Sequence, residues 1–201
     1  MTLALWLAAA YLLGATPTAY LAGRLARGID LREHGSKNLG ATNVYRVLGW
    51  RWAIPVALVD VAKGAVPVAL FARWAGGGPW VAMALGMAAV LGHVFSPYMG
   101  FRGGKGVATA LGVFLALAPL AVAIAVPVWG GSLWLTGYVS LSSIIAAVTF
   151  PVWVRLSQPA ATATFWASVG LAALIVFSHR ANMRRLVAGT ENRFHTRKGI
   201  P

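Results

Sequence analysis

Several stretches of this chain are long and apolar enough to cross a lipid bilayer, and this feature restricts the possible folds most. Residues 107–154 contain no Asp, Glu, Lys or Arg. Because about 20 apolar residues span the hydrocarbon core, we predict further spans at residues 2–23, 52–74, 80–98 and 159–178. Only 10% of residues are charged, against about 25% in soluble domains. The sequence therefore predicts an all-α polytopic membrane protein, with residues 1–201 forming one domain.

The distribution of basic residues predicts how the spans are oriented. All but three of the 17 Lys and Arg residues lie in residues 24–51, at Arg102 and Lys105, or from Arg180 onward. Under the positive-inside rule these segments face the cytoplasm, whereas Arg73 and Arg155 lie outside. The apolar stretch 107–154 must then cross an odd number of times. We expect three short crossings, with breaks near Pro119 and near 136–138. About seven transmembrane helices result, with the N-terminus outside and the C-terminus cytoplasmic.

The net charge of +13 indicates anionic partners. Nucleic acid, anionic lipid headgroups and phosphorylated substrates would all fit, but a chain with 59% hydrophobic residues makes nucleic acid the weakest of the three. We therefore expect membrane lipid and no nucleic acid as a partner. Cysteine is absent, so the chain has no disulfide, no thiolate nucleophile and no cysteine-based metal site.

Three polar segments on the predicted cytoplasmic side carry groups that bind oxyanions. The first, residues 35–46, combines hydroxyl, amide and cationic donors with two glycines that allow close approach to the backbone. Its candidate binding residues are Ser36, Asn38, Thr42, Asn43 and Arg46. A solvated loop followed by an ordinary helix start is an equally good interpretation of the Gly-Ser-x-Asn part.

The second segment, Gly103-Gly104-Lys105-Gly106, leads directly into a predicted helix with Thr109 in its first turn. Glycines expose backbone N–H groups, a helix N-terminus favours anions, and Lys105 adds a positive charge. This pattern favours a phosphate site, although a membrane-interface turn with a cytoplasmic lysine would look the same. Its spacing differs from that of a Walker A loop.

The third segment covers residues 179–191. In a continued helix His179 and Asn182 share one face, and Arg180 and Arg185 add positive charge. An interfacial histidine followed by a basic lipid anchor is the alternative.

Three titratable residues lie within predicted spans. Asp60 and Lys63 are three residues apart, and mutual pairing explains them more simply than direct catalysis does. His93 either lines a site or bonds to a neighbouring helix.

Taken together, the segments resemble a known family. GSKNLGATNVYRVLG at 35–49, GHVFSPYMGFRGGKGVAT at 92–109 and HRANMRRLVAGTE at 179–191 are similar to the three motifs of the bacterial acyl-phosphate:glycerol-3-phosphate acyltransferases, the PlsY family. GIDLR at 28–32 and DVAKG at 60–64 add to the likeness. This sequence has Lys37 where the family usually has glycine, and Arg102 where it usually has lysine.

The resemblance implies transfer of a fatty acyl group from acyl-phosphate to the 1-hydroxyl of glycerol 3-phosphate, giving lysophosphatidate in the bacterial inner membrane with the site facing the cytoplasm. An activated donor implies no acyl-enzyme, metal or cofactor. The proton acceptor is either His179 or a substrate phosphate. The implied catalytic residues are Ser36, Arg46, Lys105, His179 and Asn182. The implied substrate-binding residues are Asn38, Thr42, Asn43, His93, Gly103, Gly104, Gly106, Thr109, Arg180 and Arg185. Glu191, Asp60 and Lys63 are expected to be structural.

Other classes of membrane protein fit less well. A coenzyme A-dependent acyltransferase would carry His-x4-Asp, but no histidine here has Asp five positions later. A CDP-alcohol phosphotransferase needs more aspartates than the two present. An anion transporter is the strongest non-enzyme alternative, although transporters keep charged residues near the membrane midplane.

Overall fold

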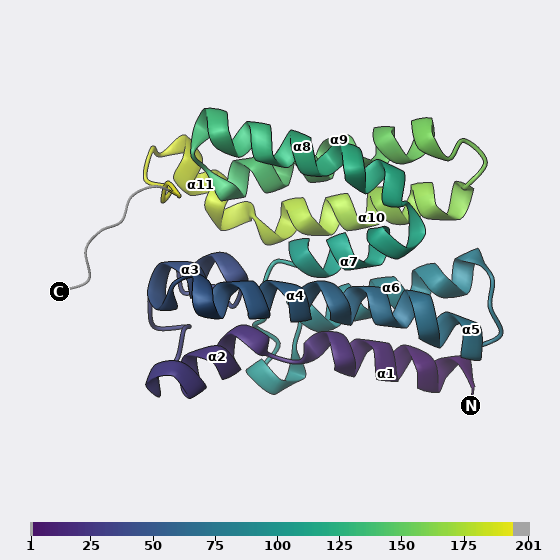
Figure 1. Cartoon of the computed structure of the whole chain (residues 1–201), viewed down its shortest axis with the longest axis horizontal. Coiled ribbons are helices and arrows are strands. Elements are labelled where there is room, and N and C mark those ends of the chain that lie inside the picture. The colour runs from purple at the N-terminus through teal and green to yellow at the C-terminus, as the bar shows by residue number, and fades with distance from the viewer. Residues whose placement is uncertain (1, 195–201) are drawn as a thin grey trace.

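The computed structural model describes residues 2–194, and within that range all regular structure is helical. The first half of the chain contains α1 (Leu3–Ala15), α2 (Thr18–Arg27), α3 (Ala41–Leu48), α4 (Trp50–Val66), the π-helical turn η1 (Pro67–Phe71), α5 (Ala72–Trp74), α6 (Pro79–Val94) and the 3-10 turn η2 (Pro97–Met99). The second half contains α7 (Val107–Leu117), α8 (Pro119–Thr136), α9 (Val139–Ser157), α10 (Thr162–Ser178) and α11 (Arg180–Val187). The long helices run nearly parallel in one bundle (Figure 1).

The helices confirm a polytopic membrane protein. Five helical segments are long and apolar enough to span: Leu3–Arg27, Trp50–Trp74, Pro79–Met99, Pro119–Thr136 and Val139–Ser157. A sixth forms if α10 and α11, which bend by 56° at His179, count as one span. The predicted breaks near Pro119 and Gly137 are present. However, α7 has 11 residues and covers only about 17 Å, less than the hydrocarbon core. The count of seven crossings and the orientation of the termini stay predictions, and Arg197 and Lys198 lie outside the described residues.

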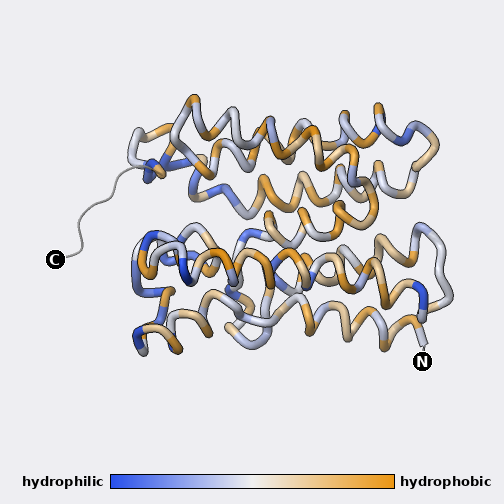
Figure 2. Tube along the Cα trace, viewed as in Figure 1, coloured by the Kyte–Doolittle hydropathy of each residue, from blue (hydrophilic) through white to orange (hydrophobic). Residues whose placement is uncertain are grey.

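The bundle has an apolar flank and one polar end. Large apolar side chains such as Trp134 (82% exposed) and Leu25 (77% exposed) point outward, as expected for a surface that contacts lipid tails. Hydrophilic residues instead gather at the end of the bundle where α3 and α11 lie (Figure 2). A water-soluble substrate would therefore meet the protein at that end.

Small residues let neighbouring helices approach closely. A Cβ on Gly64 of α4 would collide with the Thr109 carbonyl of α7, and one on Gly112 of α7 would collide with the Val61 carbonyl of α4. Close helix packing through small residues is the usual way to stabilise helix pairs in a bilayer, where the hydrophobic effect between helices is absent. The α4–α7 contact joins the two halves of the chain and places Lys105, just before α7, against the first half.

Candidate active site

Asn43 organises the loop that carries the first polar segment. It is buried in the first turn of α3, where its Oδ1 accepts from the backbone N–H of Ser36 (2.7 Å). Its Nδ2 donates to the carbonyls of Leu31 and His34 (both 3.1 Å). Since both amide protons are used within the loop, this geometry gives Asn43 a positioning function and does not support the substrate-binding role expected for it.

Lys37 adopts a backbone conformation that usually belongs to glycine. Its φ is +60°, in the left-handed region, which costs a non-glycine residue about 1–2 kcal/mol. This backbone conformation explains why the family usually has glycine at this position. In this chain a lysine occupies it despite the strain. The exposed Lys37 lines the mouth of the main cavity beside Ser36 and Asn38.

The glycines of the second segment serve packing. The N–H groups of Gly103 and Gly104 donate to the carbonyls of Val94 and His93 (both 3.0 Å), so they are not free for a phosphate. A Cβ on Gly104 would overlap the His93 ring. Neither glycine lines the main cavity, whereas Gly106, at the start of α7, does. The structure thus gives Gly103 and Gly104 a role in packing the loop against α6, and their expected phosphate-binding role stays a prediction without support from this geometry.

Thr109 also differs from expectation. It is completely buried and lies outside the cavity lining, and its carbonyl packs against Gly64 of α4. Because α4 and α7 approach so closely there, Thr109 faces protein rather than substrate. Its contacts are those of helix packing, and the substrate-binding role expected for it stays a prediction that this geometry does not support.

Lys105, Asn182 and Glu191 form a hydrogen-bonded network between the second and third segments. Lys105 Nζ donates to Asn182 Oδ1 (2.5 Å), and Asn182 Nδ2 donates to Glu191 Oε1 (2.6 Å). Glu191 also accepts from Ser140 Oγ (2.8 Å) and from Arg185 Nε (2.7 Å). Glu191 thus connects α9, α11 and the loop before α7, and it holds Asn182 and Lys105 in place.

Burial and charge set the protonation of this network. Burial raises the pKa of Glu191, but hydrogen bonds from Asn182, Ser140 and Arg185 outweigh it and bring the pKa below its usual value. Burial lowers the pKa of Lys105 to about 8, and although Glu191 opposes this shift, Arg185 and Arg46 add to it. The positive charges of Lys105, Arg185 and Arg46 repel one another, and a bound anion would relieve this repulsion.

His179 lies at the bend between α10 and α11, and its side chain is buried. Nδ1 is 2.8 Å from the Ile175 carbonyl, which places the proton on Nδ1 and leaves Nε2 as an acceptor in the neutral ring. His179 lines the same cavity as Lys105 and Asn182. Nearby Arg180 packs over the Phe177 ring, 4.4 Å from its centroid, and stays exposed at the rim.

A second polar cluster lies within the first half of the bundle. Lys63 Nζ is 2.7 Å from Asp60 Oδ1 and also donates to the Thr16 carbonyl (3.0 Å) at the break between α1 and α2. Thr18 Oγ1 donates to the same Asp60 oxygen (2.6 Å). His93 Nδ1 lies 3.8 Å from it. The buried charges of Asp60 and Lys63 are thus paired, while Asp60 and His93 also reach the cavity wall.

The segment 192–194 crosses the polar end of the bundle and contacts both halves of the chain. The backbone N–H of Phe194 donates to the Gly137 carbonyl (2.8 Å), and its ring stacks on Tyr45 with 5.0 Å between centroids. Arg46 Nη2 donates to the carbonyl of Asn192 (3.2 Å). Residues 192–194 therefore link α3 to the turn between α8 and α9.

One cavity of about 750 Å³ gathers most of the residues that the sequence singled out. Its polar wall contains Ser36, Asn38, Thr42, Asn43, Arg46, Asp60, His93, Lys105, Gly106, His179, Arg180, Asn182, Arg185 and Glu191. Ser140 and Arg184 also line it. Sequence reasoning missed Ser140 because it sits in an apolar stretch that carries no motif, and only its contact with Glu191 reveals it.

These features define a class: a polytopic helical membrane protein whose cationic cavity continues into an apolar chamber, as suits an anionic molecule with a lipid tail. The family is also clear, because residues 4–189 match the family model described as glycerol-3-phosphate acyltransferase. The chain belongs to this family.

Individual relatives agree with the family match. A glycerol-3-phosphate acyltransferase of Geobacter sulfurreducens is 48% identical over 93% of this chain and 95% of its own length, and one of Chlorobium luteolum is 41% identical over 96% and 97%. The crystal structure of PlsY (YgiH), an integral membrane glycerol 3-phosphate acyltransferase, in its glycerol 3-phosphate form has a TM-score of 0.90, 38% identity, and 96% coverage of both chains. Its lysophosphatidic acid form has a TM-score of 0.87, 36% identity, and coverage of 95% and 94%. The resemblance found in the sequence is confirmed.

Proposed function

We propose that this glycerol-3-phosphate acyltransferase uses acyl-phosphate as its donor and forms lysophosphatidate and inorganic phosphate. The observation that carries the proposal is the continuity of one cavity from the cationic cluster around Lys105 to an apolar chamber between α7 and α10. An acyl-phosphate has a dianionic head and an apolar tail, so a single molecule matches both parts. The solved relative with lysophosphatidic acid bound supports the same product here.

In this proposal Ser36, Arg46 and Lys105 bind the phosphate groups. The 1-hydroxyl oxygen of glycerol 3-phosphate attacks the acyl carbonyl carbon, and the carbon–oxygen bond to phosphate then breaks. The hydroxyl proton leaves through His179 Nε2 or goes directly to a phosphate oxygen, and it ends on the released phosphate in either case. Asn182, held by Glu191, orients the reacting groups. Positioning and charge stabilisation account for the catalysis, since the donor is already activated.

We also propose that the reaction needs neither a metal ion nor an organic cofactor. Among residues 2–194 no three or more His, Cys, Asp or Glu side chains come together as a metal site. Arg46, Arg185 and Lys105 supply the positive charge that a metal ion would otherwise bring to two phosphates. Addition of a chelator should therefore leave turnover unchanged.

The donor is tested with the purified full-length protein in detergent. Palmitoyl-phosphate, palmitoyl-coenzyme A and palmitoyl-acyl-carrier protein are each supplied with radiolabelled glycerol 3-phosphate, and lysophosphatidate is measured by thin-layer chromatography. We expect product from palmitoyl-phosphate alone. Transfer from coenzyme A with none from the acyl-phosphate would refute the proposed donor while leaving the family assignment intact.

We propose that the site faces the cytoplasm from the bacterial inner membrane. Arg51 and Arg102 belong to the basic segments that the sequence assigns to the cytoplasmic side, whereas Arg73 belongs to α5, at the end of the bundle opposite α3 and α11 (Figure 1). Because the chain has no cysteine, single variants Arg51→Cys, Arg102→Cys and Arg73→Cys report position without background. An impermeant maleimide applied to intact spheroplasts should label only Arg73→Cys. Labelling of Arg102→Cys and Arg73→Cys from the same side would contradict this orientation.

A further inference from the structure

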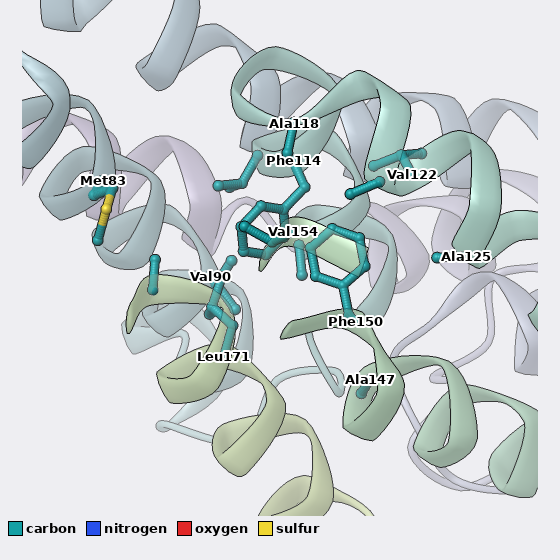
Figure 3. Packing of buried hydrophobic residues seen from close by; sticks show 14 of the residues in the cluster. Met83, Val90, Phe114, Ala118, Val122, Ala125, Ala147, Phe150, Val154 and Leu171 are labelled. Atoms are coloured by element: carbon teal, nitrogen blue, oxygen red, sulfur yellow. The ribbon is translucent and has the colours of Figure 1, made fainter. Parts of the chain in front are cut away.

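The apolar part of the cavity has a closed inner end. From the polar site it runs between α7, α8, α9 and α10, where Phe114, Val122, Ala147, Phe150 and Leu171 are among the apolar residues that line it. These five residues also belong to the largest buried apolar cluster of the protein (Figure 3). The inner end of the chamber thus borders the packed core of the second half.

The order of residues along each helix shows where the chamber ends. α7 and α9 begin beside the polar site, at Val107 next to Lys105 and at Ser140 bonded to Glu191. The last lining residue of α7 is Phe114, which is about 10 Å beyond Val107 at 1.5 Å per residue. The last lining residue of α9 is Phe150, about 15 Å beyond Ser140. No later residue of either helix lines the cavity.

The two phenyl rings meet at this end. Their centroids are 4.5 Å apart with 51° between the ring planes, and Phe114 and Phe150 are only 4% and 8% exposed. Behind them Ala118 and Val154 are fully buried. Figure 3 shows both rings between α7 and α9, with Val154 beside them. Close-packed interiors yield little to an added group, so these rings form a rigid barrier.

Two alanines widen the chamber just before the rings, although larger side chains such as Leu111, Trp129 and Ile175 also line its wall. Ala147 lies three residues, or about one turn, before Phe150 on the polar side, and Ala125 lines the facing side from α8. The pair of rings at its inner end gives the chamber a defined length.

We propose that Phe114 and Phe150 set the longest acyl chain that the enzyme accepts efficiently. This inference rests on the proposed function, because it assigns the chamber to the acyl tail of the donor. A tail that ends before the rings buries all its methylenes. A longer tail must bend or leave its last carbons outside. Burial of one methylene contributes about 0.8 kcal/mol. Each methylene that becomes buried or exposed therefore changes the affinity for the donor by about fourfold.

The experiment measures kcat/KM for myristoyl-, palmitoyl-, stearoyl- and arachidoyl-phosphate with the purified full-length protein. Phe150→Ala and Phe114→Ala should raise the ratio for arachidoyl over myristoyl donor by at least about fourfold. Ala147→Phe should lower it by a similar factor, because the new ring blocks the chamber one turn earlier. Phe165→Ala is the matched control, since Phe165 packs on the same core but does not line the cavity. Its ratio should equal that of the wild type.

Thermal unfolding in detergent identifies variants that fail to fold, and Phe150→Leu then replaces Phe150→Ala. Unchanged ratios in folded Phe150 and Phe114 variants and in Ala147→Phe would overturn the proposal, as would an equal change in Phe165→Ala. The ratio is taken with whichever donor the wild type uses. A preference for acyl-coenzyme A would refute the proposed donor, yet the dependence on chain length would still decide the role of the rings.

Discussion

Lys105→Met should lower kcat/KM by about 10²–10³-fold while the protein still folds. Lys105 Nζ donates to Asn182 Oδ1, and Lys105 lines the same cavity as His179. Removal of one preorganised donor to a charged transition state costs about 2.7–4 kcal/mol, because such a site has a low dielectric constant and little water to replace the lost interaction. Steady-state kinetics with both substrates measure the loss.

Arg102→Met provides the control, because Arg102 is an exposed cation in the same loop and does not line the cavity. It should keep wild-type kcat/KM. The pH dependence gives a second test. With a pKa of about 8, Lys105 carries its charge below that pH and loses it as the pH rises further. kcat/KM should therefore fall on the alkaline side, and in Lys105→Arg this fall should move to higher pH. Full activity of Lys105→Met would remove Lys105 from the site.

Asp60→Leu should destabilise the protein by about 3–5 kcal/mol. Asp60 and Lys63 are almost completely buried, so loss of the carboxylate leaves the Lys63 ammonium without its counter-charge inside a span. Thermal unfolding in detergent should show a large drop in Tm. The exposed acid Glu33 gives a matched control, and Glu33→Gln should leave Tm nearly unchanged.

The double variant Asp60→Leu/Lys63→Met separates pairing from other effects. Replacing a buried ion pair by apolar residues of similar volume is often neutral or stabilising, so the double variant should recover most of the stability lost in Asp60→Leu. If it is no more stable than Asp60→Leu alone, the charge on Lys63 is not the cause of the loss.

The sequence predicted the helices well because the bilayer imposes a simple length rule. The breaks at Pro119 and Gly137 follow from proline and glycine chemistry and are found as predicted. The same break near Pro119 also marks the end of α7. The sequence does not show whether α7 crosses the bilayer, because its 11 residues are apolar throughout but too few to span the hydrocarbon core as a straight helix.

The site was predicted less evenly, for a physical reason that Gly104 illustrates. A glycine can expose its N–H to a ligand, or it can let two backbone segments pack closely. The sequence does not distinguish these two roles. Only the contacts with His93 distinguish them. Asn43 poses the same problem, because an amide that binds a loop and an amide that binds a substrate are chemically identical. The charged groups Lys105, Arg185 and Glu191 were easier to interpret, since opposite charges in an apolar chain are expected to pair.

The position of Glu191 along the chain has a consequence for biogenesis. Ribosomes make the polypeptide from its N-terminus, so every hydrophobic helix from α1 to α10 leaves the exit tunnel before Glu191 does. The hydrogen bonds of its carboxylate with Asn182, Arg185 and Ser140 can therefore form only after the segment that follows α11 has emerged. Assembly of the polar site thus comes after the emergence of every helix that contributes a residue to it.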